Sequence, residues 1–65
     1  MMRITIDHDA DAAYIQITDH MGAGAVAKTY SCDPAEVGGT INLDFDGKGR
    51  LLGIELVAAS QYLQP

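Results

Sequence analysis

The acidic side chains are the residues of this chain whose spacing comes closest to that of a chemical site. Counting from Asp44, the stretch DFDGKGRLLGIE has acids at positions 1, 3 and 12 and Gly at position 6, as a calcium-binding EF-hand loop does. However, Lys48 places a cation at position 5, where that loop needs a ligand oxygen, and the loop also needs flanking helices. The flanking residues alternate as in strands, so the stretch predicts a β-hairpin that turns at Asp46–Gly47 and Gly49.

A second acidic stretch, DHDAD, begins at Asp7 and has alternate carboxylates. It has Ala12 where the calcium loop has Gly, and no Glu follows at its twelfth position. The two acidic turns could still meet in the fold, so binding of a divalent metal or a small ligand stays open as an alternative function. The weak candidate ligands are Asp7, Asp9, Asp11, Asp44, Asp46 and Glu55.

The cysteine and the histidines suggest a second kind of chemistry. Cys32 as nucleophile with His8 or His20 as base would need both groups within hydrogen-bond reach, and the sequence gives no sign of this. A lone Cys near a strand end is typical of a small half-buried apolar residue. We therefore expect no catalytic residue, no cofactor and no enzymatic activity.

Alternation of apolar and polar residues predicts the elements that must position these side chains. Isoleucine and leucine at every second position are typical of half-buried strands. The stretch PAEVGG at 34–39 is predicted to be a loop, and the tail at 58–65 a helix of about two turns with Tyr62 and Leu63 docked on the sheet. Lys28 marks a less regular strand, as at a sheet edge. The predicted strands span residues 1–7, 12–19, 25–33, 40–45 and 50–57.

These elements predict a mainly β (α+β) fold, a five-stranded antiparallel meander with a short C-terminal helix, in one small domain over residues 1–65. A sheet with one apolar face must cover that face, and one short helix is small for this purpose. A chain of 65 residues also has a marginal core, and its single cysteine excludes an internal disulfide. We therefore expect a strongly curled sheet or a homodimer.

Net charge and hydropathy limit the kinds of partner and the location that we expect for this protein. Nine acids against four scattered bases give a net charge of −5, which disfavours direct nucleic-acid binding and suits a basic protein partner. No apolar run is long enough to span a membrane, so we expect a soluble cytoplasmic protein.

Two stretches together suggest a family. RITIDHDADAAYIQI, with Asp7 and the run from Ala10 to Ile15, and NLDFDGKGRLLGIELVAAS resemble the small bacterial and archaeal proteins grouped as domain of unknown function 2283. The second stretch carries the family's hairpin pattern, here Asp44, Asp46, Gly47, Leu51, Gly53, Ile54 and Glu55. This chain has Ile6 where an aromatic residue is common in the family.

The resemblance implies a structural motif without catalytic residues. Because some relatives lie beside small toxin-like genes, it also implies an antitoxin-like role in masking a partner. The leading hypothesis is a non-enzymatic, dimeric protein-interaction module that binds a basic partner such as a ribonuclease-type toxin. Metal or small-ligand binding is the alternative, and a minor enzyme built around Cys32 is the third.

Overall fold

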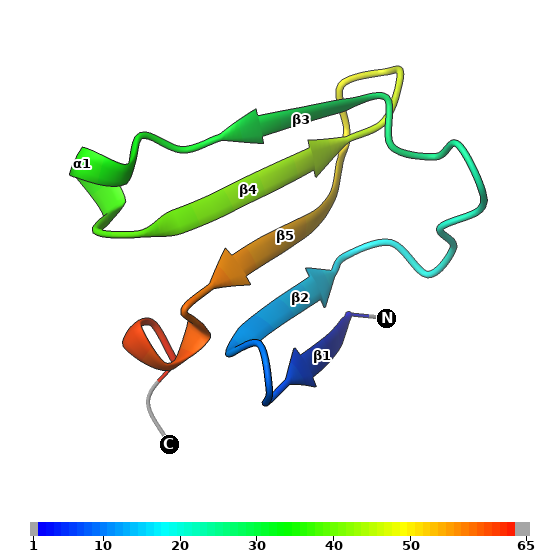
Figure 1. Cartoon of the computed structure of the whole chain (residues 1–65). Helices are drawn as coiled ribbons and strands as arrows, with labels where there is room; N and C mark the ends of the chain where they lie inside the picture. The colour runs from blue at the N-terminus through cyan, green and yellow to red at the C-terminus, as the bar shows by residue number, and fades with distance from the viewer. Residues whose placement is uncertain (1, 64–65) are drawn as a thin grey trace.

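The structure, a computed structural model, describes residues 2–63 and contains one sheet with two small helical turns (Figure 1). The strands begin and end close to where the alternation of apolar and polar residues predicts. The elements in chain order are β1 (Arg3–Asp7), β2 (Ala12–Gln16), β3 (Lys28–Ser31), α1 (Pro34–Val37), β4 (Thr40–Phe45), β5 (Leu51–Val57) and the 3-10 turn η1 (Ala59–Gln61).

The strand order is β1-β2-β5-β4-β3, and every neighbouring pair is antiparallel. The prediction of five antiparallel strands is confirmed, but the prediction of a simple meander is wrong. Residues 17–27 carry the chain past the ends of β5 and β4 to the far edge, and the chain then returns strand by strand (Figure 1). β5 therefore lies in the centre, where its many apolar residues gain a neighbour on both sides.

The register aligns one large apolar residue from each of the five strands on one face. Neighbouring strands pair Ile4 with Ile15, Ile15 with Ile54, Ile54 with Leu43, and Leu43 with Tyr30. Because side chains that face each other across paired strands share a side of the sheet, these five form a continuous line from edge to edge, here called the middle row. The face that carries the middle row is called the apolar face.

The C-terminal tail covers one end of the apolar face. Ala13, Leu56 and Ala59 form the buried cluster there, and Tyr62 packs against it, as predicted for that residue. The predicted two-turn helix is instead the three-residue turn η1, and residues 64–65 of the predicted segment lie outside the described residues. Leu63, the other residue predicted to dock, remains 37% exposed.

The segment predicted as a loop at 34–39 contains the short helix α1. The side chain of Asp33 accepts a hydrogen bond from the backbone N–H of Ala35 at 3.0 Å, and Pro34 fills the first helical turn. Gly38, with φ of 76°, ends the helix. The signals for this helix were present in the sequence, but four residues are too few to show helical periodicity.

Candidate functional site: the two faces of the sheet

The middle row is exposed at its ends and partly exposed between them in the single chain. Its two ends are more than half exposed, Ile4 at 58% and Tyr30 at 53%, and none of its three inner residues is buried. Ile15 and Ile54 pack against the buried cluster of Ala13, Leu56 and Ala59, yet each keeps part of its surface exposed even near the middle of the sheet. The neighbouring Ile6, on the same face, is 49% exposed. The apolar face therefore has a covered end beneath the tail, a partly buried centre and exposed edges.

The tail is held where it is by the β1–β2 turn. The carboxylate of Asp11 accepts hydrogen bonds from the backbone N–H of Ser60 at 3.1 Å and from its hydroxyl at 2.7 Å. The backbone N–H of Ala59 also donates to the carbonyl of Asp11 at 2.7 Å. These contacts fix the tail over the end of the sheet, which leaves the middle row only partly covered.

The opposite face is polar, and Tyr14 lies across its centre. The Tyr14 side chain extends from β2 over Gly53 in β5, so a Cβ at Gly53 would overlap the ring and the hydroxyl of Tyr14. The hydroxyl reaches β4, where it donates to a carboxylate oxygen of Asp44 at 2.8 Å. One aromatic side chain thus bridges three strands through the space that a glycine leaves free.

This position changes the ionisation of Tyr14. Burial of the phenol, followed by its hydrogen bond to Asp44 and the negative charges of Asp44 and Glu55, raises the pKa of Tyr14 from 10.0 to about 12. All four causes disfavour the phenolate. Tyr14 is therefore a neutral hydrogen-bond donor at ordinary pH.

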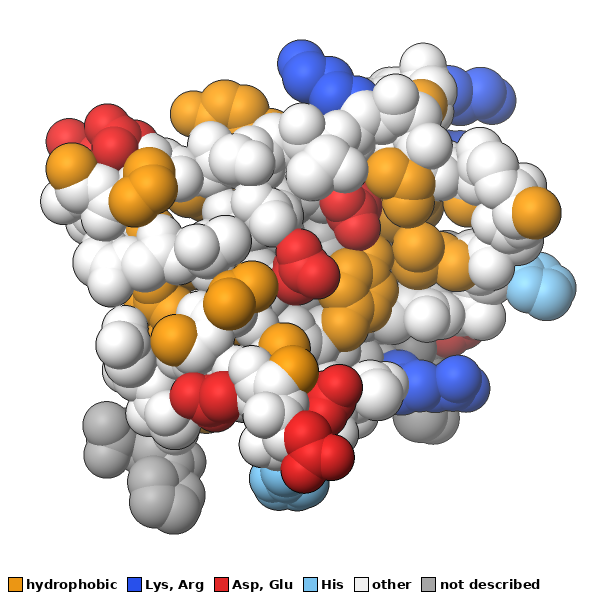
Figure 2. All heavy atoms as spheres, viewed as in Figure 1, with side chains coloured by type: hydrophobic (Ala, Val, Ile, Leu, Met, Phe, Trp, Pro, Cys, Tyr) orange, Lys and Arg blue, Asp and Glu red, His pale blue; other side chains and the backbone are white. Residues whose placement is uncertain are grey.

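The carboxylates of the polar face are held by uncharged donors. Asp44 accepts a second hydrogen bond from the Thr29 hydroxyl at 2.7 Å, and Glu55 accepts one from the Asn42 side chain at 2.8 Å. Within residues 2–63, neither carboxylate pairs with Lys or Arg. Figure 2 shows this face, with acidic side chains in the middle of the sheet and basic ones at its periphery.

The candidate metal ligands are distributed over separate places. The β1–β2 turn with Asp7, Asp9 and Asp11 follows the end of β1, whereas Asp46 lies in the β4–β5 turn at the opposite end of the sheet. The two acidic turns that might have met are therefore far apart. Among the described residues, no three His, Cys, Asp or Glu side chains form a group that could hold a metal ion.

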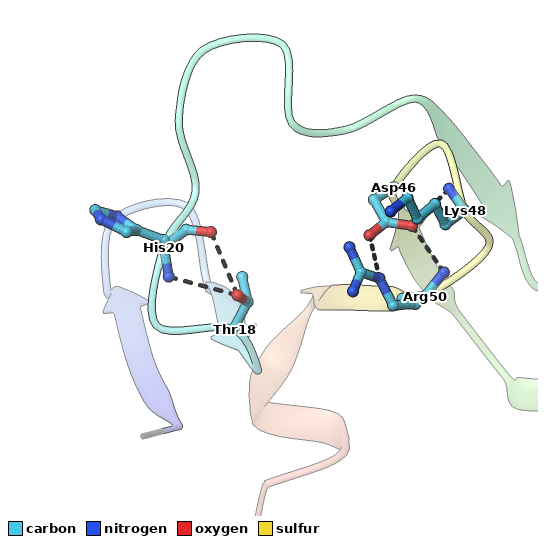
Figure 3. Close-up of polar contacts among 5 residues, drawn as sticks. All are labelled: Thr18, His20, Asp46, Lys48 and Arg50. Carbon is cyan, nitrogen blue, oxygen red and sulfur yellow. Dashed lines mark hydrogen bonds and ion pairs between the residues drawn. The ribbon is translucent and has the colours of Figure 1, made fainter.

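Each acidic turn uses its carboxylates for its own backbone. The side chain of Asp7 accepts from the backbone N–H groups of Asp9 at 3.1 Å and Ala10 at 3.2 Å. Asp46 accepts from the backbone N–H groups of Lys48 at 2.8 Å and Arg50 at 2.9 Å, and it pairs with the Arg50 side chain at 2.7 Å (Figure 3). The hydrogen bond from the Arg50 backbone is the main cause that lowers the pKa of Asp46.

The β4–β5 connection is the predicted hairpin, since strands rather than helices flank it. One detail differs from the prediction. Gly49 adopts the positive φ of 81°, whereas Gly47 does not have a positive φ. The backbone N–H of Gly49 donates to the carbonyl of Asp46 at 3.1 Å, which closes a four-residue turn. The left-handed Gly49 is the last residue of this turn.

The structure does not bring Cys32 close to either histidine. Cys32 follows β3 at one edge of the sheet, and His8 follows β1 at the other edge. His20 lies in the connection before β3, where its backbone contacts Thr18 and its ring points away from Asp46 and Arg50 (Figure 3). These positions do not make a Cys–His pair.

Sequence reasoning missed the contacts of Tyr14 with Gly53 and Asp44. A glycine inside an otherwise apolar strand was the available signal, because it often marks a close approach by another group. Identifying that group requires the pairing of β2 with β5, which a simple meander does not contain.

These two faces define a class of protein: a small antiparallel sheet with a hydrogen-bonded polar face and an open apolar face. No helix among residues 2–63 is long and apolar enough to cross a membrane. The chain belongs to the family described as Protein of unknown function (DUF2283), whose model matches residues 3–60. Comparison with curated proteins and with solved structures gives no match.

Proposed function

We propose that this protein is a non-enzymatic protein-interaction module and that the apolar face is its working surface. The observation that carries the proposal is that the middle row is exposed at both edges of the sheet and is not fully buried at any residue between them. Contiguous exposed apolar surface with a polar rim is typical of protein-binding sites, because water is released when a partner covers it. We place this activity in the cytoplasm of a prokaryotic cell.

A comparison of the two faces supports a binding role for the apolar face. The polar face uses its side chains on one another, through the hydrogen bonds of Tyr14, Thr29 and Asn42. The two end residues of the middle row, Ile4 and Tyr30, lie on the edge strands, where each has a neighbouring strand on one side only. They therefore contribute little packing within the single chain. Large apolar side chains at these ends contribute more to a contact with a partner than to the single chain.

A second candidate, the binding of a basic partner in an antitoxin-like role, is favoured by a different observation. Asp44 and Glu55 lie on the polar face without a Lys or Arg partner among the described residues. A basic protein would complement these charges at that face and would leave the apolar face free. The two candidates therefore use opposite sides of the sheet.

Site-specific photo-crosslinking in cells distinguishes them. A photoreactive phenylalanine at position 30 lies on the apolar face, and one at position 31 lies on the polar face, while both positions are exposed on β3. We expect covalent protein adducts from position 30 and few from position 31. Adducts from position 31 alone would support the basic-partner candidate instead, and no adduct from either position would contradict both.

A further inference from the structure

We infer that the protein covering the middle row is a second copy of this chain, packed apolar face to apolar face in a two-fold β-sandwich. This inference rests on the proposed function, because it names the partner of the same surface. Two sheets with apolar inner faces pack about 10 Å apart with their side chains interdigitated. The apolar face of this sheet would form one of the two inner faces of such a sandwich.

The size of the face suits this arrangement. The two longer dimensions of the molecule are 31 and 24 Å, so an interface of standard size, with roughly 800 Å² from each partner, would occupy most of the broad side that carries the middle row. The middle row crosses five strands, and with about 4.8 Å between strands it extends about 19 Å. A copy laid over it covers the whole row.

The distribution of charge also favours a second copy. The acidic residues of the strands, Asp7, Asp44 and Glu55, all fall on the polar face by register. The net charge of −5 therefore does not oppose contact between two apolar faces. Lys28 is the one strand residue of this face with a charge, and its position on the edge strand β3 lets its ammonium stay in water. A strongly charged partner would find no complementary group in the middle row.

Two-fold symmetry gives the interface a defined centre. Ile54 is in the middle strand of five, so stacking one middle row on another places Ile54 against its own copy. This holds whether Ile4 faces the partner's Ile4 or its Tyr30. An interface of this kind is self-complementary, because the same row supplies both halves.

Sedimentation equilibrium of the full chain over a range of concentrations tests the inference. We expect a mass of twice 6.9 kDa for the unchanged protein. Ile4→Lys would remove a large apolar side chain from the interface and put a charged one in its place, so it should raise the dissociation constant at least about tenfold. Thr5→Lys is the matched control, since it adds the same charge to the same strand on the opposite face, and it leaves the constant unchanged.

Tyr30→Lys with Ser31→Lys as its control repeats the comparison at the other edge of the sheet, and circular dichroism verifies that each variant is folded. A mass of 6.9 kDa at all concentrations would overturn the inference. Equal weakening by Ile4→Lys and Thr5→Lys would also overturn it and would indicate edge pairing through β1. If the purified chain is a monomer but position 30 cross-links to a different protein in cells, the inference fails while the proposed function stands.

Discussion

Tyr14 determines the geometry of the polar face because its ring occupies the space above Gly53. The hydroxyl can reach Asp44 in β4 only by crossing β5 at this position. Asp44 in turn accepts from Thr29 in β3, so two hydrogen bonds link β2, β4 and β3, and the Tyr14 ring crosses the fourth strand, β5, between them. The contacts of one residue thus tie both halves of the sheet together.

Replacing Gly53 with alanine should break this arrangement. The new methyl group would overlap the Tyr14 ring, which would have to move away from Asp44. We expect Gly53→Ala to lower the free energy of unfolding by about 1–2 kcal/mol, measured by urea denaturation. Gly47→Ala is the control, because a Cβ there meets nothing within 4 Å and the backbone is not left-handed. Equal losses in both variants would contradict the role of Tyr14.

The raised pKa of Tyr14 predicts a loss of stability in alkaline solution. Tyrosine in the unfolded chain ionises near pH 10, while folded Tyr14 keeps its proton until about pH 12. The stability that neutral Tyr14 contributes is therefore fully present below pH 10 and is lost as the pH rises through 12. The difference in unfolding free energy between the wild type and Tyr14→Phe should shrink across this interval. A difference independent of pH would contradict the assignment.

At the scale of elements, the β4–β5 hairpin depends on a left-handed residue. Gly49 has φ of 81°, a conformation that costs about 1 kcal/mol for a residue with a Cβ. We expect Gly49→Ala to reduce the free energy of unfolding by about that amount in the same urea assay. Gly47→Ala should have almost no effect. The reverse result would mean that the turn is built on Asp46–Gly47 instead.

The sequence predicts the strands well because their signal is local. Alternation of apolar and polar residues places Ile4, Ile15 and Ile54 on one face, and the register confirms it. The strand order is not local, since the pairing of β2 with β5 joins residues about 40 positions apart. Short elements such as α1 and η1 escape periodicity because they last about one turn.

The candidate site was predictable to the extent that it depends on alternation alone. An apolar face without sufficient cover follows from the strands and from the small tail, and the exposure of Ile4 and Tyr30 agrees with it. The hydrogen bonds of Tyr14 and Asp44 could not be predicted, because they depend on strand order. The acidic spacing around Asp46 reflects backbone capping within a turn.

At the scale of the whole molecule, the single chain has a small core. The buried apolar side chains of the described residues are Ala13, Leu52, Leu56 and Ala59. Ile15 and Ile54 of the middle row pack against the cluster that Ala13, Leu56 and Ala59 form, but both stay partly exposed. Covering the row with a second chain would add to the stability of each copy, because association favours the folded state. Folding and assembly should therefore be coupled.

This coupling predicts that the melting temperature depends on protein concentration. A roughly hundredfold increase in concentration should raise the apparent stability by about 2.7 kcal per mole of dimer, or about 1.4 kcal per mole of chain, and the Tm by several degrees. Ile4→Lys should reduce this dependence, whereas Thr5→Lys should retain it. Differential scanning calorimetry at graded concentrations measures both, and a constant Tm for the unchanged protein would contradict the coupling.

The most direct measurement records nuclear Overhauser effects between protomers in a mixture of isotope-labelled and unlabelled protein. A face-to-face dimer should give contacts between the Ile54 methyl groups of the two copies, together with contacts from Ile4 and Tyr30 of one copy to the middle row of the other. Intermolecular contacts that involve only Tyr14, Asn42 and Glu55, or none at all at millimolar concentration, would contradict it.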